Sequence, residues 1–208
     1  MPELPEVETV EADLRPHVVG RRVERVDLRF PAIVRHPEPE AFSDGLAGRV
    51  VEALTRRGKY LLFHLDGGDL LVIHLGMTGH LGMFAPAEPF APHVHAVLAL
   101  DDGRELRYRD PRRFGRLLLG AEADLLAHRA IPKLGPEPID DAFTAADLYR
   151  RLNRRRAPVK ALLLDQAVVA GVGNIYADES CFKARVRPDR PGSSLSWPAV
   201  KRLRLALH

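Results

Sequence analysis

A series of short apolar segments between residues 23 and 119 is the feature that most constrains how this chain can fold. The segments are rich in valine, leucine and aromatic residues, and turn signals such as Asp66-Gly67-Gly68 and Asp101-Asp102-Gly103 separate them. We predict strands at 23–30, 50–55, 60–65, 70–75, 94–100, 105–109 and 114–119. Many short strands at such close spacing favour an antiparallel sandwich or barrel.

The segments on either side of these strands have helical character. Pro5 begins a predicted helix near the N-terminus, and Gly20 is placed to end it. The prolines and small residues of 81–92 predict a loop, and from about Ala121 the periodicity becomes helical. Four further helices are predicted: through 152 after the N-cap Thr144, through 170 from Pro158, over 174–184, and over 196–208.

Residues 131–141 contain three prolines and Gly135, which interrupt the periodicity and mark a domain boundary. We therefore expect an α+β protein with an N-terminal β domain over 1–130, a linker over 131–141 and a helical domain over 142–208. The apolar face of the last helix runs up to His208 without a stop signal. For that reason we expect the sequence to be a fragment of a longer chain.

The composition excludes several classes of protein. Of the 208 residues, 46% are hydrophobic, which is enough to bury real cores, but no apolar run approaches the ~20 residues of a membrane span. The acidic N-terminus does not resemble a secretory signal. A lone Cys181 rules out an internal disulfide and a cysteine-rich metal site within these residues. We expect a soluble, cytoplasmic protein.

Charge is distributed unevenly along the chain. Residues 146–208 carry 13 Lys and Arg against 5 Asp and Glu, a net charge of +8, whereas residues 1–145 carry 18 against 23, a net charge of −5. Such an asymmetry favours a basic C-terminal surface that binds a polyanion, although scattered solvated arginines would produce the same count.

The first eight residues, MPELPEVE, can place a reactive amine at the start of the protein. Initiator methionine is normally removed when proline follows it, so the mature chain would begin with Pro2, a secondary amine. An α-amino group titrates near ~8, so a useful fraction is an unprotonated nucleophile at neutral pH. Glu3 adds a carboxyl beside it, and this pair is the minimum for Schiff-base chemistry on a sugar carbon. The alternative is an N-terminus whose two prolines only begin a helix.

Three glycine-containing turns present side chains suited to nucleic acid. Lys59, in the basic cluster RRGKY, could contact a phosphate or donate a proton, or could simply belong to a solvated loop. HLGMTG holds Met77 between two glycines, and DPRRFG presents Arg112 and Phe114. In enzymes that extrude a base from DNA, an apolar wedge and an arginine can fill the hole left behind.

A fourth motif, GVGNIYADE, predicts a helix that begins at Asn174 after a glycine turn. Backbone N–H groups and the Asn174 amide would then face outward together, and such helix N-termini are natural phosphate sites. The arginine run 154–156 and Lys160 are predicted on the preceding helix pair, where they could flank the same phosphate track. An ordinary helical hairpin is the alternative.

Together and in this order, MPELPEVET, RRGKYL, HLGMTG, DPRRFG and KALLLDQAVVAGVGNIYADE resemble the formamidopyrimidine-DNA glycosylase family, the bacterial 8-oxoguanine repair enzymes. The resemblance runs from Pro2 to about Arg190. The related endonuclease VIII branch shares the Pro-Glu start and the helical hairpin, but its start does not usually continue as LPEVET. The resemblance implies an N-terminal β-sandwich flanked by helices, a C-terminal domain with a helix-two-turns-helix motif, and DNA in the cleft between the two domains.

The resemblance also implies roles for individual residues. Pro2 matches the nucleophile that forms the Schiff base, and Glu3 matches the acid beside it. Lys59 matches the lysine that contacts phosphate and donates a proton in strand cleavage. Arg112 would face the orphaned cytosine. The residues inserted into the duplex would be Met77, Arg112 and Phe114. DNA contacts are implied at or near His74, His93, Arg155, Lys160, Asn174 and Tyr176.

The activity that the resemblance implies is that of a bifunctional DNA glycosylase and AP lyase of base excision repair. It would remove oxidised purines from double-stranded DNA through a Pro2 Schiff base followed by β,δ-elimination, with no cofactor for the chemistry. We expect a bacterial, nucleoid-associated monomer that also acts on abasic sites. The alternatives are an endonuclease VIII-like glycosylase for oxidised pyrimidines and a non-catalytic damaged-DNA-binding fragment.

Members of the family also carry a C-terminal zinc finger with four cysteine ligands. The sequence contains no such segment, so the implied structural zinc would have its ligands beyond His208. We expect a chain without this finger to fold, but to bind DNA weakly and to excise little.

Overall fold

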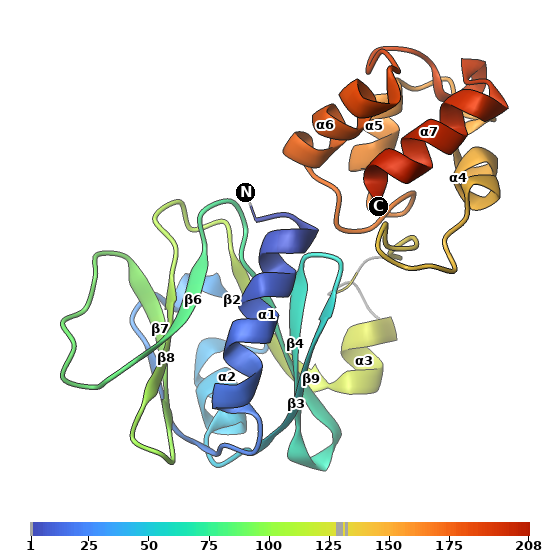
Figure 1. Ribbon diagram of the computed structural model, residues 1–208. Coiled ribbons are helices and arrows are strands. Elements are labelled where there is room, and N and C mark those ends of the chain that lie inside the picture. The colour runs from blue at the N-terminus through green and yellow to red at the C-terminus, as the bar shows by residue number, and fades with distance from the viewer. Residues whose placement is uncertain (1, 128–130, 132) are drawn as a thin grey trace. The chain divides into compact units, whose positions relative to one another are not determined.

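The computed structural model describes residues 2–127, 131 and 133–208. The chain divides into two compact units, Met1–Ile131 and Pro132–His208, and each unit has its own hydrophobic core (Figure 1). The α+β class expected from the sequence is confirmed. Among the described residues, no helix is long and apolar enough to cross a membrane.

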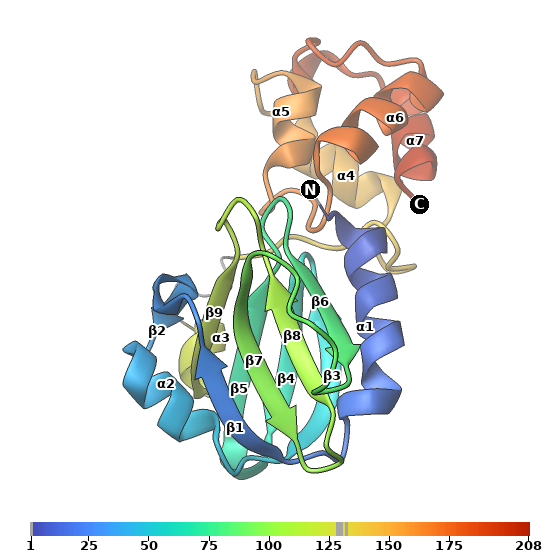
Figure 2. The same cartoon turned by 90° about the vertical axis from the view of Figure 1, so that its left-hand side faces the viewer.

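Unit 1 is a sandwich of two sheets that face each other (Figure 2). One sheet has the strand order β1-β7-β8-β6 and the other has the order β2-β9-β5-β4-β3. The strands of the first sheet are β1 (Val23–Leu28), β6 (His80–Phe84), β7 (Val94–Leu100) and β8 (Glu105–Arg109). Those of the second are β2 (Val34–His36), β3 (Val51–Arg57), β4 (Tyr60–Leu65), β5 (Asp69–His74) and β9 (Arg116–Ala121).

Alternate residues of these strands point between the sheets and form the core of unit 1. Phe63 and Leu71 of the second sheet share this core with Leu98 and Leu106 of the first. Burial of one such side chain stabilises the fold by about 1.5–3 kcal/mol. The outer face of the second sheet is buried as well, in a cluster with helix α3 (Glu122–Ala127) that contains Leu62, Leu70, Val72 and Leu125.

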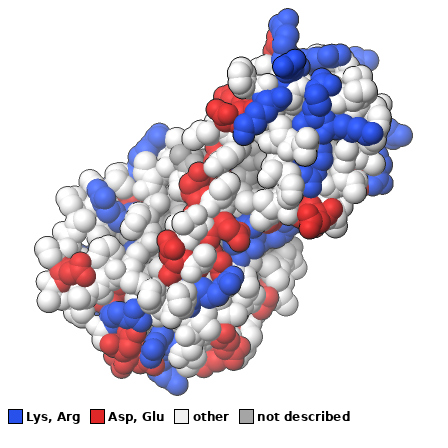
Figure 3. Space-filling view, in the orientation of Figure 1, with Lys and Arg blue, Asp and Glu red and all other residues white. Residues whose placement is uncertain are grey.

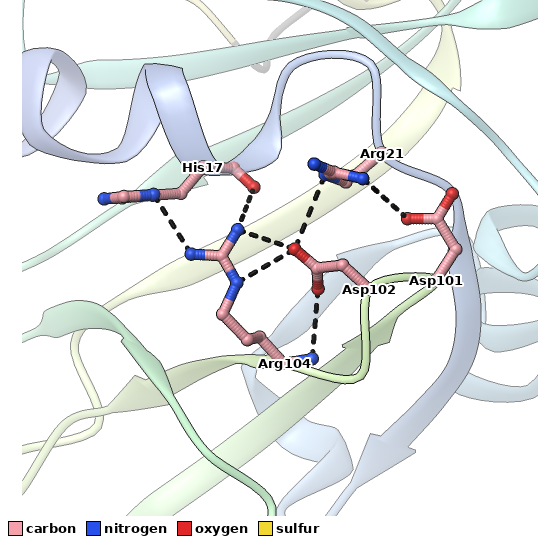
Figure 4. A network of polar contacts seen from close by, with 5 residues as sticks. All are labelled: His17, Arg21, Asp101, Asp102 and Arg104. Atoms are coloured by element: carbon pink, nitrogen blue, oxygen red, sulfur yellow. Dashed lines mark hydrogen bonds and ion pairs between the residues drawn. The ribbon is translucent and has the colours of Figure 1, made fainter.

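Helix α1 (Leu4–Val18) packs on the sandwich through buried residues at helical spacing, and α2 (Pro39–Leu46) does so through Phe42 and Leu46. A polar network fastens the C-terminal end of α1 to the β7–β8 turn (Figure 4). Arg104 lies 3.0 Å from Nδ1 of His17 and donates to Asp102 at 2.6 Å, while Arg21 forms an ion pair with Asp102 at 3.4 Å. The C-terminal end of the helix is thereby held at this turn of the first sheet.

All seven predicted strands are present, with ends within two residues of the prediction. The loop predicted over 81–92 is wrong in its first part, because β6 begins at His80 and ends at Phe84. Leu81 is buried and Met83 packs against the same core, so alternate residues of this segment face the sandwich. Gly82 between them weakens the strand signal in the sequence, since glycine has no side chain to pack.

Unit 2 is built from the helices α4 (Ala145–Leu152), α5 (Val159–Leu164), α6 (Asn174–Ala184) and α7 (Trp197–Leu207). This unit also has a 3₁₀ turn at Gly192–Ser194, and unit 1 has such turns at Pro31–Ile33 and Asp66–Gly68. Thr144 caps α4 as predicted: its hydroxyl accepts from the Asp147 N–H at 3.2 Å, and the Asp147 carboxylate accepts from the Thr144 N–H at 3.0 Å.

The helix predicted from Pro158 through 170 is wrong in length, because α5 ends at Leu164. Asp165 leaves the helix, and its carboxylate accepts a hydrogen bond from the Ala167 N–H at 3.0 Å. Aspartate side chains compete in this way with the helical backbone for its N–H groups. The chain then turns through 165–173 before α6 begins at Asn174, as predicted.

Candidate active site and nucleic-acid interface

The start of α1 places an acid beside the predicted nucleophile. Pro2 is half-buried, and Glu3, the N-cap of the helix, is only 1% exposed. The Glu6 carboxylate accepts a hydrogen bond from the Glu3 N–H at 2.9 Å, which fixes the backbone at this point. Met1, whose removal is predicted, lies outside the described residues.

Lys59 comes to the same place from the β3–β4 turn. Gly58, at φ +57°, takes the left-handed conformation that the turn requires, and Lys59 after it is 7% exposed. Burial lowers the pKa of Lys59, while the charges of Glu3 and Glu6 oppose this shift. Arg56, near the end of β3, forms an ion pair with Glu8 of α1. Helix α1 and this turn therefore hold the predicted acid and the predicted lysine within electrostatic reach of each other.

His74, at the end of β5, adds a neutral donor to this cluster. Its ring lies 4.9 Å from the ring of Tyr60, which pairs with it across the sheet. Burial, together with the positive charges of Arg116 and Lys59, lowers the pKa of His74 to about 4. Nδ1 accepts a hydrogen bond from the Gly76 N–H at 3.2 Å, so the ring proton is assigned to Nε2. His74 is therefore an uncharged N–H donor at neutral pH.

Two connections, 75–79 and 110–115, carry the residues predicted to enter the duplex. Figures 1 and 2 show these β5–β6 and β8–β9 connections at the same end of unit 1 as the start of α1. A Cβ atom on Gly76 would lie 2.6 Å from the Gly115 nitrogen, so only glycine allows the two connections to approach this closely. Met77 is 38% and Phe114 50% exposed, and the guanidinium carbon of Arg112 lies 4.8 Å from the centre of the Phe114 ring.

Asp110 holds these two connections together, and reasoning from the sequence missed it. The side chain is buried and accepts from the Thr78 hydroxyl at 2.5 Å and from the Gly115 N–H at 2.8 Å. Burial alone would raise the pKa of Asp110, but these hydrogen bonds, with others from Arg112 and Tyr108, lower it. An aspartate directly after a strand and before Pro111 was the available signal, since such residues commonly organise turns.

His93 lies at the end of the β6–β7 connection. It is exposed, and its backbone has the left-handed φ of +68° that is uncommon for a residue with a side chain. The His93 carbonyl accepts from the Asp110 N–H at 3.0 Å. Asp110, which joins connections 75–79 and 110–115, therefore also fixes the backbone of His93.

The predicted phosphate site of unit 2 lies at the start of α6. Asn174 is its first residue and is exposed, and Tyr176 packs partly against the core of the unit. The preceding turn is held by Gln166, whose amide group accepts from the Gly171 N–H at 2.9 Å and donates to the Val172 carbonyl at 2.9 Å. The side chain of Gln166 thus supports the turn that exposes the helix N-terminus.

Of the basic residues predicted to flank this helix start, Lys160 lies on a helix as predicted, but the arginine run does not. The run 154–156 lies in the connection between α4 and α5, not on a helix, because α4 ends at Leu152. Arg155 forms an ion pair with Asp165 at 2.9 Å, and Lys160 of α5 forms one with Asp178 at 2.8 Å. Figure 3 shows Lys and Arg gathered over unit 2 on the face drawn, with acidic and basic side chains mixed over unit 1.

The described residues offer no group of three or more His, Cys, Asp or Glu that could hold a metal ion. Cys181 is buried in the core of unit 2, where burial raises the pKa of its thiol to about 11 and disfavours the thiolate that metals bind. The residues that the structure describes therefore do not fit a zinc site.

Comparisons with known proteins cover both units. The family model described as the formamidopyrimidine-DNA glycosylase N-terminal domain matches residues 1–117, and the H2TH domain model of the same family matches residues 134–207. A formamidopyrimidine-DNA glycosylase of Moorella thermoacetica is 50% identical over 207 residues, which are 100% of this chain and 76% of the relative. One of Geobacillus kaustophilus is 48% identical over 98% of this chain and 74% of its own length.

Solved structures of proteins with the same family name superpose on this chain. The MutM (Fpg) protein of Thermus thermophilus superposes with a TM-score of 0.86 at 47% identity, covering 99% of this chain and 73% of that one. The Lactococcus lactis enzyme bound to DNA containing an AP site superposes with a TM-score of 0.92 at 31% identity, covering 99% and 78%. A variant of that enzyme in complex with Fapy-dG-containing DNA gives 0.93 at 31% identity, covering 99% and 75%.

A sandwich that buries an acid and a lysine close to Pro2, followed by a helix-two-turns-helix unit, defines a DNA glycosylase of base excision repair with AP lyase activity. Both matched domain models and the relatives at 48–50% identity carry the same family description. The chain belongs to the formamidopyrimidine-DNA glycosylase family. The family expected from the sequence motifs is thereby confirmed.

Proposed function

We propose that this chain removes oxidised purines, namely 8-oxoguanine and formamidopyrimidines, from double-stranded DNA and then cleaves the resulting abasic site. The strongest support is the burial of Glu3 and Lys59 beside Pro2, because excision with strand cleavage needs a nucleophilic amine and groups that carry protons. The Lactococcus lactis structures with abasic-site DNA and with Fapy-dG-containing DNA support the same class of substrate.

The proposed reaction begins when the Pro2 nitrogen attacks the anomeric carbon of a flipped nucleotide. Glu3 gives its proton to O4′ as the bond between C1′ and O4′ breaks and the sugar ring opens. The bond between the base and C1′ then breaks, and the base leaves with the proton that the Pro2 nitrogen loses. The nitrogen is then part of an iminium ion, which withdraws electrons and makes the neighbouring C2′ hydrogen acidic. Loss of that proton expels the 3′ phosphate, and a second elimination expels the 5′ phosphate. The protein residues suffice as electron sink and proton carriers.

In this proposal Lys59 contacts a phosphate and carries a proton during strand cleavage. Its lowered pKa supports the role, because an ammonium that releases its proton more readily is a better acid near neutral pH. His74 is proposed to donate a hydrogen bond from its Nε2–H group to a phosphate. Further phosphate contacts are proposed for His93, Arg155, Lys160, Asn174 and Tyr176.

Extrusion of a base costs a few kcal/mol, and we propose that three exposed side chains offset this cost. Met77 and Phe114 would fill the gap and wedge the stacked bases, while Arg112 would bond to the orphaned cytosine. Their exposure and the close packing of their two connections support this role. We further propose that the chain acts as a monomer, and that it works in the bacterial cytoplasm on the nucleoid.

Borohydride trapping tests this proposal. The protein is incubated with a duplex that carries 8-oxoguanine opposite cytosine, and borohydride reduces any iminium to a stable covalent adduct. We expect an adduct whose linkage maps to Pro2, and we expect Glu3→Gln to excise the base much more slowly. An adduct that forms only with oxidised pyrimidines would indicate an endonuclease VIII-like enzyme. Binding without any adduct would indicate a non-catalytic module.

A further inference from the structure

The connection between β6 and β7, residues 85–93, has no helix or strand of its own. A buried arginine donates hydrogen bonds to three of its backbone carbonyls. Arg107 of β8 is 1% exposed. Its guanidinium donates to the carbonyls of Glu88 at 2.9 Å, Ala85 at 3.1 Å and Pro89 at 3.5 Å. Its other N–H groups bind the Glu105 carboxylate at 2.8 Å through Nε and Nη2. All three nitrogens of the guanidinium group thus donate to acceptors inside the protein.

An aromatic contact reinforces this arrangement. The guanidinium carbon of Arg107 lies 4.1 Å from the centre of the Phe90 ring, and that of Arg29 lies 4.2 Å from the same ring. Phe90 is therefore held by two cations, although 44% of it is exposed. The charge of Arg107 is balanced by Glu105, so its three hydrogen bonds to carbonyls of residues 85–93 and this contact order the connection without leaving a buried charge unpaired.

The far end of residues 85–93 is fixed by the same strand. Arg109 donates to the Pro92 carbonyl at 2.9 Å, and the Asp110 N–H donates to the His93 carbonyl at 3.0 Å. A left-handed backbone at a residue such as His93 persists only where its surroundings determine it. β8 and Asp110 directly after it therefore fasten the connection at both ends. The position of His93 is set by the position of this connection.

We propose that Arg107 is a positioning residue for the imidazole of His93, which it holds in place to contact a DNA phosphate. Arg107 cannot contact DNA itself, because it is buried and each of its guanidinium nitrogens donates inside the protein. It acts through the backbone of residues 85–93 instead. The inference rests on the proposed function, in which His93 contacts DNA.

A double-mutant cycle tests the proposal, using affinity for a duplex that carries a stable abasic-site analogue. We expect His93→Ala to weaken binding about tenfold, the effect of one lost charge-assisted hydrogen bond. Arg107→Lys keeps the charge but cannot reach all the acceptors, and we expect a similar loss. The double variant should bind no more weakly than His93→Ala alone. The single-turnover rate at saturating protein should change less than about twofold, since the loss is one of binding.

Arg25→Lys is the matched control, because Arg25 is exposed on β1 of the same sheet and should bind like the parent protein. Phe90→Leu is a milder probe of the same connection, and it decides the matter if Arg107→Lys does not fold. Its loss of affinity should be smaller and should also vanish in the His93→Ala background. Losses that add fully to that of His93→Ala would overturn the proposal. His93→Ala without effect would refute the DNA contact itself.

Discussion

At the scale of single residues, the start of α1 and the ends of β4 and β5 create a small region of unusual protonation. Lys59 is a buried amine and His74 a half-buried imidazole, and both have lowered pKa values because burial disfavours their charged forms. Glu3 and Glu6 offset part of this effect at Lys59, whereas Arg116 and Lys59 add to it at His74. Lys59 therefore gives up its proton more readily than an ordinary lysine. His74 is a neutral hydrogen-bond donor at neutral pH.

We predict that His74 makes stability depend on pH. Its pKa falls from 6.5 in the unfolded chain to about 4 in the folded protein, so the unfolded state binds more protons between these values. The associated stability is complete above about pH 6.5 and is lost as the pH falls toward 4, on the order of 2–3 kcal/mol. Urea unfolding at pH 7 and pH 4.5 measures this loss of stability. The reference is His74→Asn, which keeps an acceptor for the Gly76 N–H but has no imidazole to titrate. Equal losses in both proteins would contradict the assignment.

We predict that Lys59→Met separates strand cleavage from covalent capture. Cleavage of an abasic duplex should slow by at least about 10²-fold, the usual contribution of a positioned proton carrier, while borohydride still traps an adduct at Pro2. A lysine whose pKa is lowered on folding destabilises the fold at neutral pH, so the variant should be at least as stable as the parent. Lys183→Met, an exposed change on α6, is the control. Cleavage at the parental rate would exclude Lys59 as the proton carrier.

At the scale of elements, the site depends on how closely connections 75–79 and 110–115 pack. Gly76 has a φ of +64° and lies against the backbone of Phe114 and Gly115. Asp110 then bonds to residues in both connections, including Thr78 and Gly115. The exposed side chains at the tips therefore stand on a rigid base, as insertion into a stacked duplex requires.

We predict that Gly76→Ala is far more damaging than Gly103→Ala. Both glycines have positive φ, so each substitution costs about 1 kcal/mol of backbone strain. A Cβ on Gly103 meets nothing within 4 Å, whereas one on Gly76 meets backbone atoms at 2.6 Å that cannot rotate away. Denaturant unfolding should show Gly76→Ala to be destabilised by several further kcal/mol, with a loss of affinity for the lesion duplex. Similar stabilities for the two variants would show that the connections can separate without cost.

At the scale of the whole molecule, charge and architecture are divided between the two units. Residues 146–208 carry a net charge of +8 and residues 1–145 a net charge of −5. The groups with altered pKa values near Pro2 belong to unit 1, and the exposed helix start at Asn174 belongs to unit 2. This division suggests that unit 2 contributes affinity for any duplex, while unit 1 contributes the chemistry.

We predict that changes in unit 2 weaken binding to damaged and undamaged duplex alike. Asn174→Ala should lower both affinities by the same factor. Lys160→Gln should lower both and also reduce the slope of log affinity against log salt by about 0.9, because one fewer counterion is released. The ion pair of Lys160 with Asp178 must open for this contact, so Asp178→Asn should strengthen binding. A change in lesion preference alone would contradict the assignment.

Much of this protein could be predicted from properties that act over a few residues. The seven predicted strands between 23 and 119, the Thr144 cap and the start of α6 at Asn174 depend on local periodicity, capping and turn chemistry, and the structure has all of them. The five motifs also sufficed to recognise the family, because each motif is contiguous in the sequence.

Other features exist only after distant segments have packed. Asp110 bonds to Thr78, 32 residues away, and Arg107 bonds to Ala85, 22 residues away, so neither role is visible in the residues around them. β6 is a strand because Leu81 and Met83 find a core to enter, although Gly82 weakens its local signal. The pKa of Lys59 falls because α1 and the β3–β4 turn bury it together. Burial, desolvation and hydrogen-bond partners are properties of the packed chain, so local sequence patterns leave them undetermined.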